Sequence, residues 1–222
     1  MTLYPVMLNI SSRKVVVIGG GSVALRKVED LVRCGALVTV IAPELHETIA
    51  AMHAADPERV HVLERAYRHG DLEGAHIVFA ASGDERVNHE VFLEANEKKI
   101  FINAVDDPGN CSFFVPSWFT RDGLVISVST SGISPSLAAK IRRDIEKVIP
   151  DSIEHILTAL QAARKTLREE KFKKLSSSER GRILKKIVDN DDLLHELVRS
   201  YNADSVDTFI RKIIVNDPKE IS

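Results

Sequence analysis

A run of apolar residues that stops at three glycines and continues as a helical pattern most constrains the fold. Residues 15–18 are Val-Val-Val-Ile, and glycines occupy positions 19–21. With Ala24 they form a G-x-G-x-x-A series. Gly19 permits a tight turn, Gly21 lets a pyrophosphate approach the backbone, and Ala24 lets the helix pack close to the strand. The series therefore predicts a dinucleotide-binding turn between a strand and a helix.

The start of that helix is a candidate phosphate site, because its first N–H groups are unpaired and the helix dipole is positive there. A glycine-rich turn in another kind of α/β protein is the alternative. The buried-type strand before the glycines and the helix after them favour the dinucleotide. The candidate cofactor-binding residues of this turn are Gly19, Gly20, Gly21, Ser22 and Val23.

Strand and helix patterns alternate along the first half of the chain. Strands separated by helices of this length predict a parallel, Rossmann-type α/β sheet with helices on both faces. The predicted strands are residues 15–18, 37–41, 60–65, 77–81 and 100–105, and the predicted helices are residues 23–34, 44–54 and 85–98.

The character of the sequence changes after the turn at residues 107–110. Residues 113–119 and 124–129 read as an antiparallel strand pair, and Ser134-Pro135 opens a helix that Pro150 closes. The remainder is helical, with capping boxes expected at Asp151/Glu154 and Ser176/Glu179. We therefore expect a dinucleotide-binding domain at 1–111, a small α+β dimerisation segment at 112–150 and a helical domain at 151–222.

The bulk composition excludes several classes of protein. The chain is 44% hydrophobic and 28% charged, with a net charge of −2, so nothing draws it to nucleic acid. No apolar stretch is long enough to cross a membrane, and the N-terminus lacks the layout of a secretory signal. Its two cysteines, Cys34 and Cys111, form no C-x-x-C pair. We expect a cytoplasmic protein with no membrane or nucleic-acid partner and no metal site of its own.

Two further strand ends lie at the edge where such sheets bind ligands. Ala42, Pro43 and Glu44 follow the second strand, so the acidic residue that commonly holds the adenosine ribose is not directly at the strand end. Glu44 either reaches the ribose or is a carboxylate at the start of the next helix. No arginine lies at the end of this strand to meet a 2′-phosphate, which favours NAD over NADP. Ala81 and Ser82, after the fourth strand, complete the cofactor candidates.

A polar cluster follows the last strand of this region and contains Asn103, Asp106 and Asp107. A carboxylate at this edge can act as a general base or orient a substrate N–H group. Two acids before Pro-Gly are also ordinary turn chemistry. Position alone does not decide between Asp106 and Asp107 as the catalytic residue, and Asn103 is a substrate-binding candidate.

Three hydroxyl residues precede the helix that begins near Pro135: Thr130, Ser131 and Ser134. Hydroxyl and free N–H groups at a helix start suit the carboxylates of a substrate. The basic residues of that helix, Lys140, Arg142 and Arg143, attract an acidic ligand or form a solvated face.

An ordered series of segments over about residues 3–145 resembles the precorrin-2 dehydrogenase/sirohydrochlorin ferrochelatase family, which forms the N-terminal part of sirohaem synthases. The likeness is specific as a series, although no single segment is. The segments are residues 4–8, 13–21, 24–27, 38–44, 80–84, 103–107, 113–117 and 130–135.

The resemblance implies NAD-dependent oxidation of precorrin-2, a tetrapyrrole, to sirohydrochlorin on the route to sirohaem and cobalamin. The family's key aspartate falls on Asp106, and Thr130 matches a serine near the active site of a relative. Family dimers pair through the segment at about 112–150, so a homodimer is expected. We expect no methylation of uroporphyrinogen, because no counterpart of the methyltransferase domain of the trifunctional enzymes is found in these residues.

Three other functions remain open, one of which is an unrelated oxidoreductase. The chain is either a dehydrogenase alone or a bifunctional enzyme that also inserts Fe²⁺ or Co²⁺ into sirohydrochlorin, as some family members do. A non-catalytic NAD(H)-sensing module is the alternative of another class, and it predicts cofactor binding without turnover.

Overall fold

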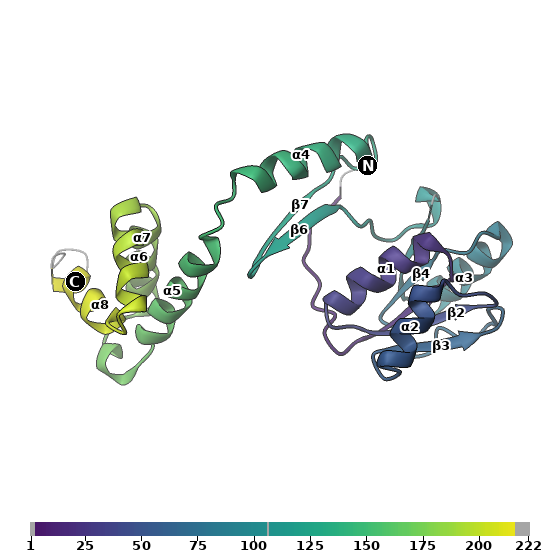
Figure 1. Cartoon of the computed structure of the whole chain (residues 1–222), viewed down its shortest axis with the longest axis horizontal. Coiled ribbons are helices and arrows are strands. Elements are labelled where there is room, and N and C mark those ends of the chain that lie inside the picture. Colours follow the sequence, from purple (N-terminus) through teal and green to yellow (C-terminus); the bar gives the residue numbers. More distant parts are fainter. Residues whose placement is uncertain (1–2, 106, 216–222) are drawn as a thin grey trace. The chain divides into compact units, whose positions relative to one another are not determined.

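The computed structural model describes residues 3–105 and 107–215, and the chain divides into two compact units, Met1–Val115 and Pro116–Ser222. Figure 1 labels the helices and strands of the two units. The strands of the first unit are β1 (Lys14–Ile18), β2 (Leu37–Ala42), β3 (Val60–Glu64), β4 (Ile77–Ala80) and β5 (Phe101–Ala104). Its helices are α1 (Ser22–Arg33), α2 (Glu47–Ala55), α3 (Glu85–Glu97) and the short 3₁₀ helix η1 (Pro108–Asn110).

The five strands form one parallel sheet in the order β3-β2-β1-β4-β5. β1 lies at the centre, because the chain first builds outward through β2 and β3 and then crosses to β4 on the other side of β1. This reversal creates a crevice at the carboxyl ends of β1 and β4, where open α/β sheets bind their ligands. The predicted Rossmann-type fold is confirmed.

Alternate residues of β1 face opposite sides of the sheet and build two cores. Val15 and Val17 pack with α1 and α2, and Val16 and Ile18 pack with α3. All four side chains are essentially buried. Helices therefore cover both faces of the sheet, as the alternation of strands and helices predicts.

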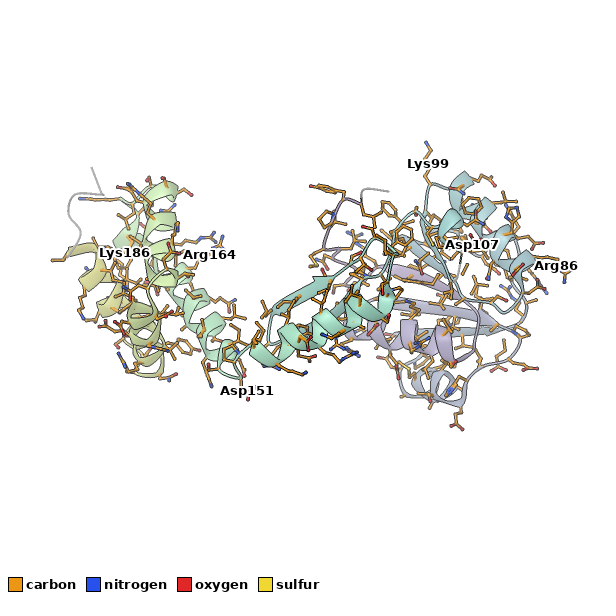
Figure 2. The ribbon with its side chains drawn as sticks, turned by 90° about the horizontal axis from the view of Figure 1, so that it is seen from above. Arg86, Lys99, Asp107, Asp151, Arg164 and Lys186 are labelled. Carbon is orange, nitrogen blue, oxygen red and sulfur yellow. The ribbon has the colours of Figure 1, made fainter. Side chains whose placement is uncertain are left out.

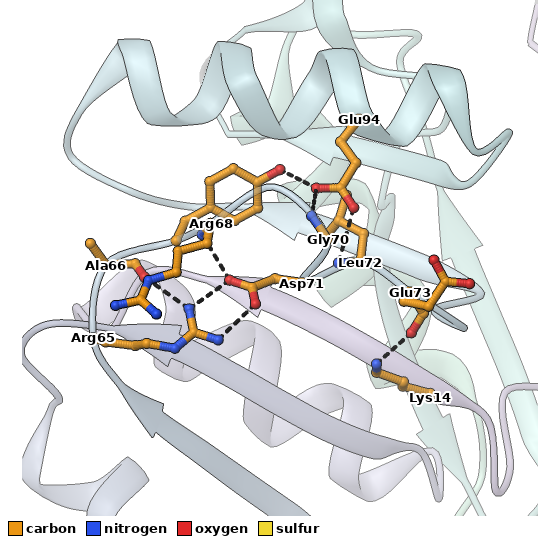
Figure 3. A network of polar contacts seen from close by, with 10 residues as sticks. Lys14, Arg65, Ala66, Arg68, Gly70, Asp71, Leu72, Glu73 and Glu94 are labelled. Carbon is orange, nitrogen blue, oxygen red and sulfur yellow. Dashed lines mark hydrogen bonds and ion pairs between the residues drawn. The ribbon is translucent and has the colours of Figure 1, made fainter.

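The connection from β3 to β4 is a loop held by the buried carboxylate of Glu94 on α3, which is 1% exposed (Figure 3). The Glu94 carboxylate accepts hydrogen bonds from the Tyr67 hydroxyl and from the backbone N–H groups of Gly70 (2.9 Å) and Leu72 (3.3 Å). Burial and the neighbouring Glu94 carboxylate raise the pKa of the Tyr67 hydroxyl, which therefore stays protonated and donating. A salt bridge of 2.7 Å between Arg65 and Asp71 closes the same loop.

Replacing Glu94 with alanine should destabilise the first unit by about 2–4 kcal/mol, because the Tyr67 phenol and the N–H groups of Gly70 and Leu72 lose their acceptor. The measurement is urea unfolding followed by circular dichroism. The control is Glu90→Ala on the same helix, where the side chain is exposed. Equal unfolding midpoints for the two variants would contradict this role for Glu94.

The second unit begins with an antiparallel hairpin of β6 (Ser117–Arg121) and β7 (Leu124–Val128). Asp122 and Gly123 form its two-residue turn, both with positive φ (48° and 96°), which suits the twist of a hairpin. Five α-helices and a short 3₁₀ helix follow: α4 (Pro135–Val148), α5 (Ile153–Thr166), η2 (Glu170–Phe172), α6 (Ser177–Val188), α7 (Asp191–Asn202) and α8 (Val206–Val215).

The expected division of the chain at residues 112 and 151 stays a prediction. The helices α5 to α8 share one buried cluster that includes Ala159, Leu167, Ile187 and Ile210. In the described part of the chain, no helix is long and apolar enough to span a membrane.

Three predicted helix starts have clear outcomes. Ser134 caps α4 by accepting from the Leu137 N–H group, and Ser176 forms the expected capping box with Glu179. The box predicted at Asp151 and Glu154 is wrong: α5 begins at Ile153 with no side-chain cap on it. Asp151, labelled in Figure 2, instead pairs with Arg121 of the hairpin at 3.2 Å.

Two predicted boundaries also shift. The strand expected at 113–119 begins only at Ser117, because the Phe113 ring packs edge-on against Phe79 in the first unit, with ring centroids 5.5 Å apart. The helix expected at 44–54 begins at Glu47, with His46 as its cap. The residues before that cap run as a bend against the glycine turn after β1.

Candidate functional site

The glycine turn after β1 is shaped by two backbone carbonyl groups that press on it. A Cβ atom at Gly19 (φ 126°) would lie 2.3 Å from the carbonyl oxygen of Ala81, and one at Gly20 would lie 2.0 Å from that of Glu44. Neither carbonyl can move freely, because each belongs to the backbone. Gly19 and Gly20 are therefore required by the fold itself.

Gly21 differs from the two glycines before it. Its φ of −81° is one that any residue adopts, and a Cβ atom there would meet no described atom within 4 Å. The open space lies directly before the first turn of α1. This is where the motif requires a pyrophosphate to approach the backbone, so the geometry fits a bound dinucleotide.

The N-terminus of α1 is equipped to bind phosphate. Among the described residues no side chain caps the helix, and its first turn holds no acidic residue. The N–H groups of Ser22 and Val23 belong to that first turn, where no carbonyl within the helix can pair with them. Together with the positive end of the helix dipole they form a site that attracts anions.

At the end of β2, Ala42 is buried whereas Pro43 and Glu44 are exposed. The alternative that Glu44 is a helix-start carboxylate is wrong, because α2 begins three residues later. The bend has a tertiary cause: the Glu44 carbonyl packs on Gly20, and the His46 N–H group donates to the Gly20 carbonyl oxygen at 2.7 Å. The Glu44 side chain is left free of the helix and available to a ribose.

The loop after β4 brings Ala81 and Ser82 to the same turn, since Ala81 is the residue that presses on Gly19. Asn88 of α3 holds this loop through two hydrogen bonds with the backbone of Ser82. The role of Asn88 was not expected from the sequence, because an Asn four residues into a helix gives no local sign of it. The neighbouring His89 is exposed and stacks on Phe92.

Asp106 lies outside the described residues, and its catalytic assignment stays a prediction. Its neighbour Asp107, labelled in Figure 2, lies just before η1, and its carboxylate accepts a hydrogen bond of 2.6 Å from the Asn110 side chain. Asp107 therefore has a turn-forming role of its own. The Asn103 side chain donates to the Phe113 carbonyl oxygen at 3.1 Å, which fixes the segment after η1 against β5.

The thiol of Cys111 bridges Ala104 at the end of β5 and Asp107 just before η1. It accepts a hydrogen bond from the Ala104 N–H group (3.2 Å) and lies within donating distance of the carbonyl oxygens of Ala104 (3.1 Å) and Asp107 (3.3 Å). Burial raises the pKa of this thiol, so it stays protonated and able to donate. The sequence offered no signal for this role beyond an isolated cysteine.

Thr130, Ser131 and Ser134 form a compact turn in the second unit. The Thr130 hydroxyl accepts from the Ser134 N–H group and donates to the Ser134 carbonyl oxygen, both at 3.0 Å. Ser131 is exposed and has a positive φ of 53°. The Ser134 hydroxyl caps α4, so Ser131 is the residue of this turn whose hydroxyl is most available to a ligand.

The basic residues of α4 are largely paired within the helix. Lys140 pairs with Asp144 at 2.8 Å, and Arg142 pairs with Glu146. These pairs favour the solvated-face interpretation of the two residues. The described residues contain no group of three or more His, Cys, Asp or Glu side chains that could hold a metal ion.

The sheet and its glycine turn define a dinucleotide-binding protein of the Rossmann class. A family model described as "Putative NAD(P)-binding" matches residues 6–117, and one described as "Sirohaem biosynthesis protein central" matches residues 121–147. The first model covers half of the chain. The first unit is therefore a nicotinamide dinucleotide-binding domain.

Individual relatives are also proteins of sirohaem biosynthesis. The siroheme synthase of Methylobacillus flagellatus is 41% identical over 150 residues, and siroheme synthase 1 of Cronobacter sakazakii is 39% identical over 153 residues. These alignments cover 68% and 69% of this chain but only 32% of each relative, so the chain spans about a third of their length.

A solved structure of SirC, a precorrin-2 dehydrogenase, is similar with a TM-score of 0.72 and 26% identity, covering 95% of this chain and 98% of that one. The chain belongs to the precorrin-2 dehydrogenase family, which forms the N-terminal part of sirohaem synthases.

Alanine at Gly20 should lower the stability of the fold, whereas alanine at Gly21 should lower the affinity for NAD⁺. Gly20→Ala places a methyl group against a fixed carbonyl and should lower the melting temperature by several degrees, as about 1–3 kcal/mol of overpacking does. Gly21→Ala should leave the melting temperature nearly unchanged and weaken NAD⁺ binding at least about tenfold, the equivalent of about 1.4 kcal/mol. Thermal unfolding and titration calorimetry measure the two effects. If Gly21→Ala binds NAD⁺ with unchanged affinity, the pyrophosphate does not bind in the open space at Gly21.

Proposed function

We propose that this chain catalyses the NAD⁺-dependent dehydrogenation of precorrin-2 to sirohydrochlorin. The observation that carries the proposal is the open space at Gly21 before an uncapped helix, in a chain of which 95% is covered by the similarity to SirC. The cofactor supplies the hydride acceptor. Dehydrogenation transfers one hydride to the nicotinamide and releases one proton from the substrate.

The residues of the chain have separate roles in this proposal. The N–H groups of Ser22 and Val23 bind the pyrophosphate, and Gly21 leaves room for it. Asp106 removes the proton or orients a pyrrole N–H group. Asn103 stays a substrate-binding candidate. Thr130, Ser131 and Ser134 are the candidates for the substrate's carboxylates, with Ser131 the most available of the three.

Activity is tested by anaerobic NADH formation from precorrin-2, followed at the absorbance of NADH. Asp106→Asn should lower kcat by about 10²–10⁴-fold, the usual contribution of a general base. Asp107→Asn is the comparison, because that carboxylate already has a turn-forming partner in Asn110. Full activity in Asp106→Asn would remove this residue from the mechanism. NAD⁺ binding without turnover by the wild type would instead support the sensing alternative.

We propose NAD rather than NADP as the cofactor. The exposed Glu44 carboxylate suits the 2′-hydroxyl of the adenosine ribose and repels a 2′-phosphate. Residues 41–55 contain no arginine or lysine that could replace it.

Glu44→Gln should therefore narrow the preference for NAD⁺ over NADP⁺ by about tenfold, since it removes one repelling charge near the phosphate. Dissociation constants for both nucleotides measure the effect. The control is Glu47→Gln, an exposed acid in the first turn of α2. An unchanged ratio in Glu44→Gln would refute Glu44 as the discriminating residue.

The bifunctional alternative keeps this fold and adds insertion of Fe²⁺ or Co²⁺ into sirohydrochlorin. The match to the sirohaem-biosynthesis family model at residues 121–147 is consistent with this bifunctional alternative. Anaerobic incubation with sirohydrochlorin and the metal ion, without NAD⁺, tests it. Insertion no faster than the spontaneous rate would exclude it.

We also propose that the chain forms a homodimer through α4. Leu137, Ile141 and Val148 recur along one face of this helix and are 48%, 38% and 75% exposed. Apolar side chains that gather at helical spacing on an exposed face are typical of an interface. The cytoplasmic location of the protein stays a prediction.

The dimer is tested by light scattering after gel filtration. The wild type should have twice the 24.6 kDa mass of the chain, and Ile141→Asp should shift it toward the monomer. Arg143→Asp, an exposed position on another face of α4, is the matched control and should remain dimeric. A monomeric wild type would contradict the proposal.

A further inference from the structure

A side chain of the next helix holds the loop that leaves β4. The Asn88 carboxamide accepts a hydrogen bond from the Ser82 N–H group at 3.1 Å and donates one to the Ser82 carbonyl oxygen at 2.9 Å. Both polar backbone groups of Ser82 are therefore paired with the same amide. The Ser82 hydroxyl accepts from the Asp84 N–H group at 3.1 Å, which completes a closed loop of three residues.

This loop is in direct contact with the first glycine of the phosphate turn. A Cβ atom at Gly19 would lie 2.3 Å from the carbonyl oxygen of Ala81 and 3.0 Å from the nitrogen of Ser82. The peptide group between Ala81 and Ser82 therefore rests on Gly19. This peptide group forms a wall beside the glycine turn, and the position of Ser82 fixes the position of that wall.

The wall lies on one particular side of the turn. In the strand order β3-β2-β1-β4-β5, β4 and the strand β2 that leads to Glu44 flank β1 on opposite sides. A dinucleotide crosses this crevice with its adenosine half toward the end of β2 and its pyrophosphate at the turn. The other half, which carries the nicotinamide, therefore falls on the side of β4.

We infer that Asn88 is a positioning residue for the nicotinamide half of the cofactor. It does not touch the cofactor itself. It fixes the Ala81–Ser82 peptide on Gly19, and through that peptide it sets the wall against which the nicotinamide riboside binds. The inference rests on the proposed function only in requiring that the first unit binds NAD⁺.

The test compares two nucleotides on the purified full chain by titration calorimetry. Asn88→Ala should raise the dissociation constant for NAD⁺ about tenfold, because the loop loses two hydrogen bonds that fix it. It should change the constant for ADP by less than about twofold, because ADP contains the adenosine half and the phosphates only. Asn88→Asp should behave like Asn88→Ala, since a carboxylate keeps the acceptor but repels the Ser82 carbonyl oxygen.

The matched control is Asn96→Ala, on the same helix. The Asn96 side chain is exposed and bonds only within its own helix, to the Phe92 carbonyl oxygen at 3.0 Å. This variant should bind NAD⁺ and ADP as the wild type does. Thermal unfolding of each variant accompanies the titrations, so that affinity is measured on folded protein.

Two results would overturn the inference. Equal weakening of NAD⁺ and ADP in Asn88→Ala would show a general loss of structure, and unchanged NAD⁺ affinity would show that the loop needs no such support. Failure of the proposed function would look different, since a wild-type chain that binds NAD⁺ but forms no NADH from precorrin-2 leaves the inference standing. A wild-type chain that binds no NAD⁺ at all would overturn both.

Discussion

The close packing of the β1–α1 turn against two neighbouring strand ends is the constraint on which the site depends. Carbonyl groups of Glu44 and Ala81 press on Gly20 and Gly19 from the two sides, so the turn is locked between the extensions of β2 and β4. A Cβ atom at Gly21, by contrast, would meet no described atom within 4 Å beyond its chain neighbours. The same glycine run thus provides both a rigid base and an opening, and the opening lies before a helix end that attracts anions.

The edge of the sheet is organised by side chains that bond to backbone. Asn88 holds the segment after β4, and Cys111 bridges the loop after β5 through Ala104 and Asp107. Loops that carry functional groups are precise only when a rigid scaffold holds them. In this chain Asn88 ties the loop after β4, and Cys111 and Asn103 tie the segment after β5. The proposed chemistry depends on these ties as much as on the groups that would meet the substrate.

The sequence predicts the parts of this structure whose signals are local. The five parallel strands, the glycine turn, the Ser134 cap and the Ser176 box all follow from residue types at fixed spacing. The start of α2 was mispredicted because the bend before it is imposed by packing of Glu44 on Gly20, which is a contact between distant segments. Asp151 failed as a cap for the same kind of reason, since Arg121 draws it into an ion pair. The roles of Asn88 and Cys111 depend wholly on partners elsewhere in the fold.

The central claim is that NAD⁺ lies on the turn after β1 with its pyrophosphate at the start of α1. Amide chemical shifts of the isotope-labelled chain, recorded during an NAD⁺ titration, test it most directly. The account predicts that the largest shift changes fall on the N–H groups of Gly21, Ser22 and Val23, with a smaller set at Ser82. Saturable NAD⁺ binding that leaves these amides unmoved, or no binding at all, would contradict it.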